Sequence, residues 1–257
     1  MYILTQTCKT NDASVPETDR TFFETLDKEM LANYTCVNPN QNLFIKNLQS
    51  LTKHQKIAAI LQYTHLPKTI ISIFVDSIYV LDFHGFYNLV TELRINIREE
   101  LGEFANGANP KNIRAPHFSL LRSIILKDMN LDIHQSAAEK YTHQFLLKLK
   151  QCVNRDNPYY VSGVVYALES SAITELQIVK RLIQDILSPR TLSARFTFFF
   201  DSHIGPIETG HKHDLQENCL EYLTSDIHRR HFESGFKDVL EIMELWWDSM
   251  YHSLLTD

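Results

Sequence analysis

The amino-acid sequence predicts an all-α protein, and two observations carry that prediction. Glycine and proline occur only 7 and 8 times in 257 residues, whereas a sandwich or barrel of many strands needs a turn about every ten residues, usually built from these two residue types. Apolar residues also recur at helical spacing, as Phe22, Leu26 and Met30 do. We therefore expect a bundle of roughly six or more helices around one hydrophobic core.

The N-terminal part of the chain is expected to form successive helices. A proline followed by two acids at 16–19 suits a first helical turn, because proline fits the first position and acids favour the positive end of the helix dipole. Residues 38–42 are typical of a turn. The expected helices cover 16–33, 43–48, 52–63 and an apolar segment from Pro67 to about Leu101 that bends or breaks near Gly85.

The C-terminal part begins with the clearest loop, 102–116, which holds two glycines and two prolines. Further helices, punctuated by Pro158 and Pro189, are expected over 117–128, 135–152, 159–187, 191–203 and 226–254. No linker rich in glycine and serine divides the chain. We therefore expect residues 16–257 to form a single domain after a flexible N-terminal lead of residues 1–15.

Composition and charge exclude several classes of partner. The chain has 25 basic and 31 acidic side chains and a formal net charge of −6, which disfavours nucleic acid because proteins that bind it usually carry a basic face. The most apolar stretch, Ile70 to Phe83, contains two aspartates and is too short to span a membrane. Four widely spaced cysteines suit a reducing compartment, and the N-terminus does not indicate a signal peptide. A cytoplasmic location is therefore expected.

The first two segments that could carry chemistry lie on either side of the loop. Glu99 and Glu100 end a long apolar helix, and because adjacent residues differ by about 100° around a helix, one acid can face inward while the other faces water. His117 begins an apolar helix after the loop. Solvated acids and capping or packing histidines are common, so neither segment indicates a site by itself.

The third segment, 159–183, begins as a nearly uncharged helix that should be buried, with Glu169 in its middle. A buried carboxylate must be paired, hydrogen-bonded or bound to metal, because an isolated buried charge is costly. Two interpretations therefore stay open. Glu169 is either a metal ligand or one half of an ion pair with Arg122 or Arg195.

The fourth segment, 195–217, places three histidines and a glutamate after four phenylalanines. Glu208 and His211 are three residues apart and so lie on one side of a helical turn. A Gly-Pro pair at 205–206 should distort the helix between them and His203, whereas His213 is expected at the surface. Carboxylates and imidazoles with no cysteine nearby favour iron or manganese over a thiolate zinc site.

Together these segments resemble the heme-oxygenase-like diiron oxidases, and among them the CADD-like branch. Residues 99–102 (EELG) and 117–121 (HFSLL) are similar to the family's acid-rich turn and the histidine that follows it, although the loop between them is longer than in the family. Residues 166–169 (YALE) are similar to its aromatic-x-x-Glu helix. Residues 198–211 resemble its aromatic run and His-x3-Asp-x2-His motif, with one more residue and glutamate for aspartate.

The resemblance implies a heme-oxygenase-like (TenA/CADD-like) fold with about seven core helices. It implies a non-haem diiron oxidase or oxygenase that uses dioxygen to oxidise or cleave a small organic substrate, with two iron ions, or a Mn/Fe pair, as cofactor. A homodimer and an electron donor of unidentified kind are further expectations. The residues at the family's ligand positions are Glu99, His117, Glu169, His203, Glu208 and His211.

Two other functions stay open at the level of the sequence. A TenA-like hydrolase of thiamin-related compounds has the same fold and no cofactor, but it would need a nucleophilic cysteine in its pocket, for which Cys152 and Cys219 are the candidates. A non-catalytic helical binding or interaction protein would instead use Glu169 in a structural ion pair.

Overall fold

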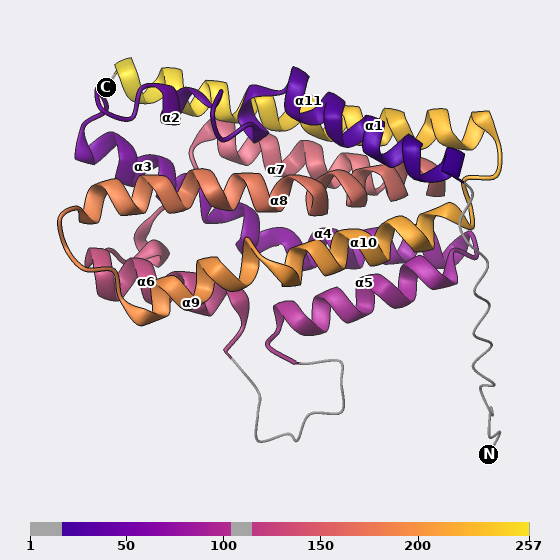
Figure 1. The fold of residues 1–257 in the computed structure, drawn as a ribbon, viewed down its shortest axis with the longest axis horizontal. Coiled ribbons are helices and arrows are strands. Elements are labelled where there is room, and N and C mark those ends of the chain that lie inside the picture. Colours follow the sequence, from indigo (N-terminus) through magenta and orange to yellow (C-terminus); the bar gives the residue numbers. More distant parts are fainter. Residues whose placement is uncertain (1–16, 104–114, 257) are drawn as a thin grey trace.

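The computed structural model describes residues 17–103 and 115–256, apart from the side chains of residues 17–20, 135 and 206–209. Within these residues the chain forms helices and no β-strand, so the all-α prediction is confirmed (Figure 1). The expected lead of residues 1–15 lies outside the described residues. The elements are α1 (Glu17–Asn33), η1 (Thr35–Val37), α2 (Leu43–Lys46), α3 (Lys53–Tyr63), α4 (His65–Phe83), α5 (Tyr87–Glu100), α6 (His117–Met129), η3 (Ile133–Gln135), α7 (Lys140–Val153), α8 (Pro158–Leu187), α9 (Ala194–His203), α10 (Pro206–Leu220) and α11 (Asp226–Thr256), where η marks a 3-10 helix.

Local capping explains where several of these helices begin. Thr52 and Gln55 form a capping box at the start of α3, in which each side chain bonds a backbone N–H that the helix leaves free. The Asn157 side chain accepts a hydrogen bond from the Tyr160 backbone N–H at the start of α8, where proline occupies the first turn. Ser193 caps α9 in the same way. These helices therefore begin at threonine, asparagine and serine residues, whose side chains favour the start of a helix over its interior.

Helix α8 is the centre of the bundle, because it is buried along most of its length. It packs against α11, α10, α3, α4 and α9. Figure 1 shows α11 and α1 on one side of it and α10 and α5 on the other. Buried apolar side chains from Phe23 to Leu254 form one cluster around this axis. The residues on α8 that face inward therefore lie in the least solvated part of the molecule.

Two glycines let α8 and α11 approach closely. A Cβ atom built on Gly163 of α8 would lie 1.9 Å from the Phe232 carbonyl oxygen of α11, and one on Gly235 of α11 would lie 2.0 Å from the Tyr160 carbonyl oxygen of α8. Neither distance is compatible with a side chain. The crossing of the two longest helices thus depends on having no side chain at either position.

The structure agrees with most of the expected helix positions and differs at two. The apolar segment that starts near Pro67 breaks as expected, because α4 ends at Phe83 and Gly85 adopts a left-handed φ of 80° before α5 begins. The helix expected over 135–152 begins only at Lys140, after the short η3. The sequence also did not indicate α10, whose first residue is Pro206.

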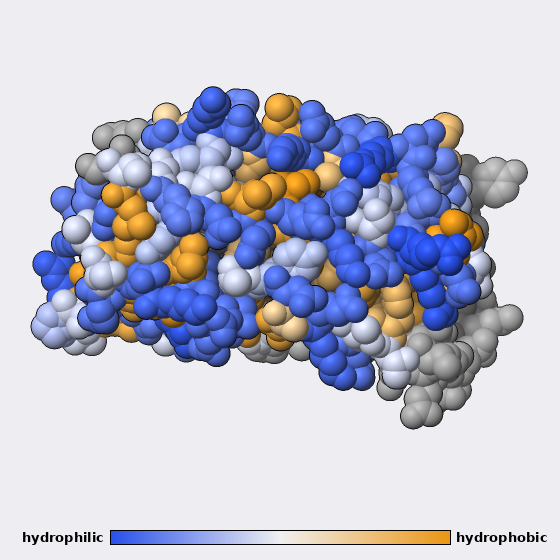
Figure 2. Space-filling view, turned by 90° about the horizontal axis from the view of Figure 1, so that it is seen from above, coloured by the Kyte–Doolittle hydropathy of each residue, from blue (hydrophilic) through white to orange (hydrophobic). Residues whose placement is uncertain are grey.

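The surface is mixed in character. Figure 2, which views the molecule from the side of α1 and α11, shows hydrophilic residues spread across that face with hydrophobic residues in separate small groups. Among the described helices, none is long and apolar enough to cross a membrane.

Candidate metal centre

Five helices bring the expected site residues toward one region of the bundle. Glu99 and Glu100 are the last residues of α5, and His117 is the first residue of α6. Glu169 lies in the middle of α8. His203 and His211 come from the end of α9 and from α10. The backbone of Glu208 belongs to α10, but its side chain lies outside the described residues.

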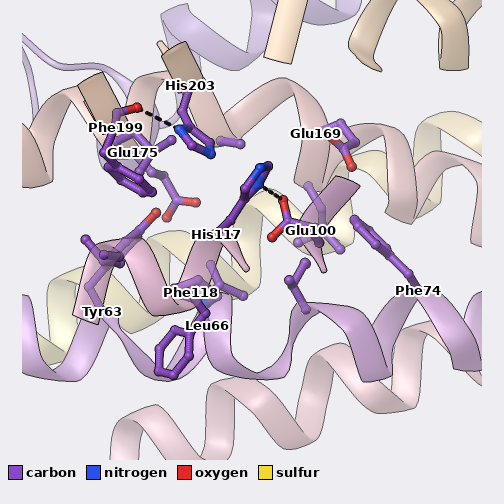
Figure 3. A pocket seen from close by; sticks show the side chains of 16 residues that line it. Tyr63, Leu66, Phe74, Glu100, His117, Phe118, Glu169, Glu175, Phe199 and His203 are labelled. Carbon is purple, nitrogen blue, oxygen red and sulfur yellow. Dashed lines mark hydrogen bonds and ion pairs between the residues drawn. The ribbon is translucent and has the colours of Figure 1, made fainter. Parts of the chain in front are cut away.

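A pocket lies between these helices, and Figure 3 shows the side chains that line it. Its apolar lining comes mainly from α4, α6 and α8. No lysine, arginine or cysteine lines it among the described residues. The polar lining consists of Tyr63, Glu100, His117, Glu169, Glu175 and His203. Five of these six residues, all except Tyr63, lie in the segments that the sequence singled out.

His203 is the most informative side chain in the pocket. Its Nδ1 lies 2.6 Å from the Phe199 carbonyl oxygen, and because a carbonyl only accepts, Nδ1 carries the proton and donates it. Burial and the neighbouring His117 lower the pKa of His203 to about 4, so the ring is neutral near pH 7. Its Nε2 therefore presents a lone pair, and this buried atom has no hydrogen-bond partner.

His117 faces His203 and pairs with a carboxylate. The two imidazole rings meet edge to face with their centroids 4.3 Å apart. Nδ1 of His117 lies 3.0 Å from Oε1 of Glu100. The inward-facing acid of the pair at the end of α5 is therefore Glu100, which lines the pocket.

Glu99 lies with a different histidine. Its Oε2 is 2.5 Å from Nε2 of His211, whose side chain is almost fully buried. Burial acts to lower the pKa of His211, but the nearby carboxylates of Glu169, Glu99 and Glu100 outweigh it and raise that pKa. His211 is thus held beside three acids.

Glu169 is buried, as the sequence predicts, and its contacts bear on the ion-pair interpretation of it. Its Oε1 accepts a hydrogen bond of 3.3 Å from the Asn96 side chain. Burial raises the pKa of Glu169, His211 lowers it and Glu100 raises it. No ion pair joins Glu169 to Arg122 or Arg195 within the described chain, and Arg195 lies instead near Asp128, at 3.9 Å.

The candidate ligands lie in pairs, His117 with Glu100 and His211 with Glu99, and do not surround one common point. In residues 17–103 and 115–256, no three histidine, cysteine, aspartate or glutamate side chains form a group that could already hold a metal ion. The donors nevertheless fit one chemically, because carboxylate oxygens and imidazole nitrogens are ligands that iron and manganese accept. The buried lone pair of His203 fits best of all, since its other nitrogen is fixed by a carbonyl as in many metal-bound histidines.

Sequence reasoning missed several residues of this region. Glu92, Asn96 and Glu100 lie four residues apart on α5 and so share one helical face, a spacing that was available in the sequence. Glu92 is buried, and burial with the charge of Asp214 raises its pKa to about 7 although His211 lowers it. Glu175, six residues after Glu169, also lines the pocket. His213 lies at the surface, as expected, with 64% of its side chain exposed.

The cysteines that a TenA-like hydrolase would need lie elsewhere. Cys152 is buried beside the Tyr160 hydroxyl, 3.4 Å away. Cys219 is fully buried, and burial raises its pKa well above the usual range. A thiol held neutral in this way is a poor nucleophile.

The arrangement of helices is found in other solved structures. The chain is similar to a CADD-like protein of unknown function from Nostoc punctiforme PCC 73102, with a TM-score of 0.83, 19% sequence identity and coverage of 92% of this chain and 98% of that one. It is similar to a domain of unknown function with a heme oxygenase-like fold from Shewanella denitrificans OS217, with a TM-score of 0.64, 16% identity and coverage of 95% and 94%. It is also similar to a TenA homolog from Pseudomonas syringae pv. tomato DC3000, with a TM-score of 0.63, 10% identity and coverage of 97% and 99%.

These likenesses define the class of the fold as heme-oxygenase-like, of the TenA and CADD-like kind, and they confirm the fold that the resemblance implies. A family model matches residues 20–252. The chain belongs to that family, DUF3865, which is described as a domain of unknown function with a solved structure. No curated protein matches the chain.

Proposed function

We propose that the protein is a non-haem diiron oxidase or oxygenase that uses dioxygen to oxidise or cleave a small organic molecule. One observation carries the proposal: the buried Nε2 of His203 has a lone pair with no partner and opens on the pocket that Glu100, His117 and Glu169 line. A buried acceptor without a partner is costly, and a metal ion is the partner that such a nitrogen commonly binds. The likeness of the sequence to diiron oxidases supports iron in this role.

The proposed ligands combine the predicted set with one residue that the structure adds. Glu100, His117, Glu169 and His203 line the pocket, and His211 with Glu99 adjoins it. Glu208 stays a predicted ligand. A Mn/Fe pair is the alternative to a pair of irons, since both metals accept this set of ligands.

The chain's own residues prepare the site in three ways. The Phe199 carbonyl fixes the tautomer of His203, and Asn96 orients the Glu169 carboxylate. Because burial raises the pKa of Glu169 and Glu92, cation binding must displace protons from this region. Apolar side chains from α4 and α6, such as Leu66 and Phe118, exclude bulk water.

A bound pair of iron ions supplies the capacity to activate dioxygen, which no amino-acid side chain provides. The protein's part is to admit a small organic substrate to the apolar pocket and to hold it beside the ligands. The electron donor and a homodimeric assembly remain expectations of this proposal.

The two other functions receive less support. A TenA-like hydrolase lacks its nucleophile, because no cysteine lines the pocket in the described chain. A binding protein with a structural ion pair would neutralise Glu169 with an arginine, and neither candidate arginine is paired with it there.

The proposal is tested by anaerobic titration of the purified full-length protein with Fe(II), followed by iron analysis after removal of unbound metal. We expect two iron ions per chain. His203→Ala should lose bound iron, whereas His213→Ala, which changes an exposed histidine of the same segment, should keep the full amount. A protein that stays free of iron, or a His203→Ala variant that binds as much iron as the parent, would refute the proposal.

A further inference from the structure

The pocket has a second polar end that the proposed iron site does not use. Glu175, on α8, is only 2% exposed and lines the pocket together with Tyr63. Figure 3 shows the Glu175 carboxylate and the Tyr63 hydroxyl directed toward one another, with His117 and His203 between them and Glu169. The two acids of α8 thus lie at opposite ends of one cavity.

A tyrosine ring at this second end packs against two tryptophan rings that lie behind the lining of the pocket. Nε1 of Trp247 donates a hydrogen bond of 2.9 Å to Oε1 of Glu175. The Tyr63 ring lies 6.0 Å from that of Trp247 and is stacked on that of Trp246, 6.4 Å away. Because Trp247 meets Glu175 through its N–H edge, the indole fixes the orientation of the carboxylate at this end of the pocket.

Nothing else in the pocket offers Glu175 a compensating charge. No lysine or arginine lines the cavity among the described residues. Burial raises the pKa of Glu175 to about 8, although the hydrogen bond from Trp247 lowers it. A buried acid in these surroundings is destabilising, and an apolar residue of similar size would be less costly there. Glu175 is therefore largely protonated near pH 7 without a ligand, and a positively charged group that arrives with a ligand would favour its ionised form.

We propose that Glu175, within its aromatic surroundings, recognises a primary amine at the end of an elongated apolar substrate. The inference rests on the proposed function, because it assigns the class of substrate that the iron site would act on. An ammonium group placed at Glu175 would direct the apolar chain toward His117 and His203, which lie between Glu175 and Glu169. Glu175 is thus a binding residue that positions the substrate and is not a metal ligand.

An apolar carboxylate ligand fits this end poorly. It would bring a negative charge to a buried acid, with no lysine or arginine in the described lining to offset it. An alcohol of the same length could enter the apolar part of the pocket but would gain no charge-assisted hydrogen bond. Three probes of equal chain length therefore separate the contributions of the apolar chain and of the terminal group.

The test measures binding of n-octylamine, n-octanol and n-octanoate to the full-length protein, with and without iron. Intrinsic fluorescence reports the event directly, because the only two tryptophans of the sequence, Trp246 and Trp247, lie at this end of the pocket. We expect octylamine to bind tightest. Glu175→Gln, which keeps an oxygen to accept from Trp247, should weaken octylamine about tenfold to a hundredfold, the range for a hydrogen bond to a charged group, and leave octanol unchanged.

A matched variant at the other end of the pocket separates this inference from the proposed function. Glu169→Gln should lose iron and still bind octylamine, whereas Glu175→Gln should keep iron and lose octylamine. If the parent protein binds octylamine but no iron, the proposed function fails and the amine site stands. If octylamine binds no better than octanol, or if Glu175→Gln binds it as the parent does, the amine site is wrong. The comparison of probes on the parent protein does not depend on how well any variant folds.

Discussion

At the scale of single residues, the account depends on how hydrogen bonds fix the protonation of buried groups. Nδ1 of His203 donates its proton to the Phe199 carbonyl oxygen, so the lone pair of Nε2 is left to bind a metal ion. Glu169 is held by Asn96 rather than by a basic side chain. Both contacts orient a candidate ligand without adding charge, which is how residues behind a metal site usually act.

A substitution of Asn96 tests whether a residue behind the site orients a metal ligand. It is 1% exposed, and its amide donates to the Glu169 carboxylate. Asn96→Leu keeps the branching of the side chain at Cγ and removes the donor, so we expect iron affinity to fall about tenfold to a hundredfold, the usual cost of losing an outer-shell partner. Competition with a chelator of known affinity measures the change. Unaltered affinity would show that Asn96 does not orient the ligand.

The hardest feature of the site to predict from the sequence was which acidic residues belong to it. The sequence identifies Glu169 as a buried acid because the helix around it is uncharged. It cannot show that Glu100 rather than Glu99 lines the pocket, because each acid pairs with its own histidine from another helix. Glu175 gave no signal because its partner, Trp247, is 72 residues away in the chain.

At the scale of elements, the helices that could be predicted are those with a strong apolar pattern or a clear capping residue. Helices α8 and α11 have both long apolar faces and bounds close to those expected. Helix α10 was missed because it begins with a Gly-Pro pair and its buried residues, such as His211 and Leu215, include a polar side chain. The pair at 205–206 separates two helices rather than bending one.

The crossing of α8 and α11 yields a prediction about stability. A methyl group at Gly163 would collide with the Phe232 carbonyl oxygen, so we expect Gly163→Ala to lower the free energy of unfolding by about 1–3 kcal/mol or more. Gly210→Ala is the matched control, because nothing lies within 4 Å of a Cβ there and alanine favours helix. Thermal denaturation followed by circular dichroism compares the two. Equal stability of the variants would mean that the helices do not cross as closely as described.

At the scale of the whole molecule, stability depends on buried acids and histidines that face one another in the core. Burial raises the pKa of Glu92 from 4.5 to about 7 and that of Glu175 from 4.5 to about 8. Between the unfolded and folded pKa values the folded state binds more protons than the unfolded state, so stability falls as pH rises through that window. Below pH 6.5 the neutral His203 opposes this trend, because its pKa is lowered to about 4. The two acids together outweigh this one histidine, so the net loss should extend from about pH 4.5 to about pH 8.

The iron-free protein should accordingly show a decreasing melting temperature across that pH range. Glu175→Gln cannot ionise, so its melting temperature should decrease less steeply than that of the parent. Each unit of pKa shift corresponds to about 1.4 kcal/mol, so the difference is measurable by calorimetry at several pH values. Parallel curves for the two proteins would mean that the pKa of Glu175 is the same in the folded and unfolded states.

The most direct test of the central claim is a Mössbauer spectrum of the full-length protein loaded with isotopically enriched iron and then exposed to air. The account predicts two iron ions per chain whose spectrum shows magnetic coupling between them, and loss of that coupled signal in His203→Ala. A spectrum of isolated ferric ions, or an iron content too low for a pair, would contradict it.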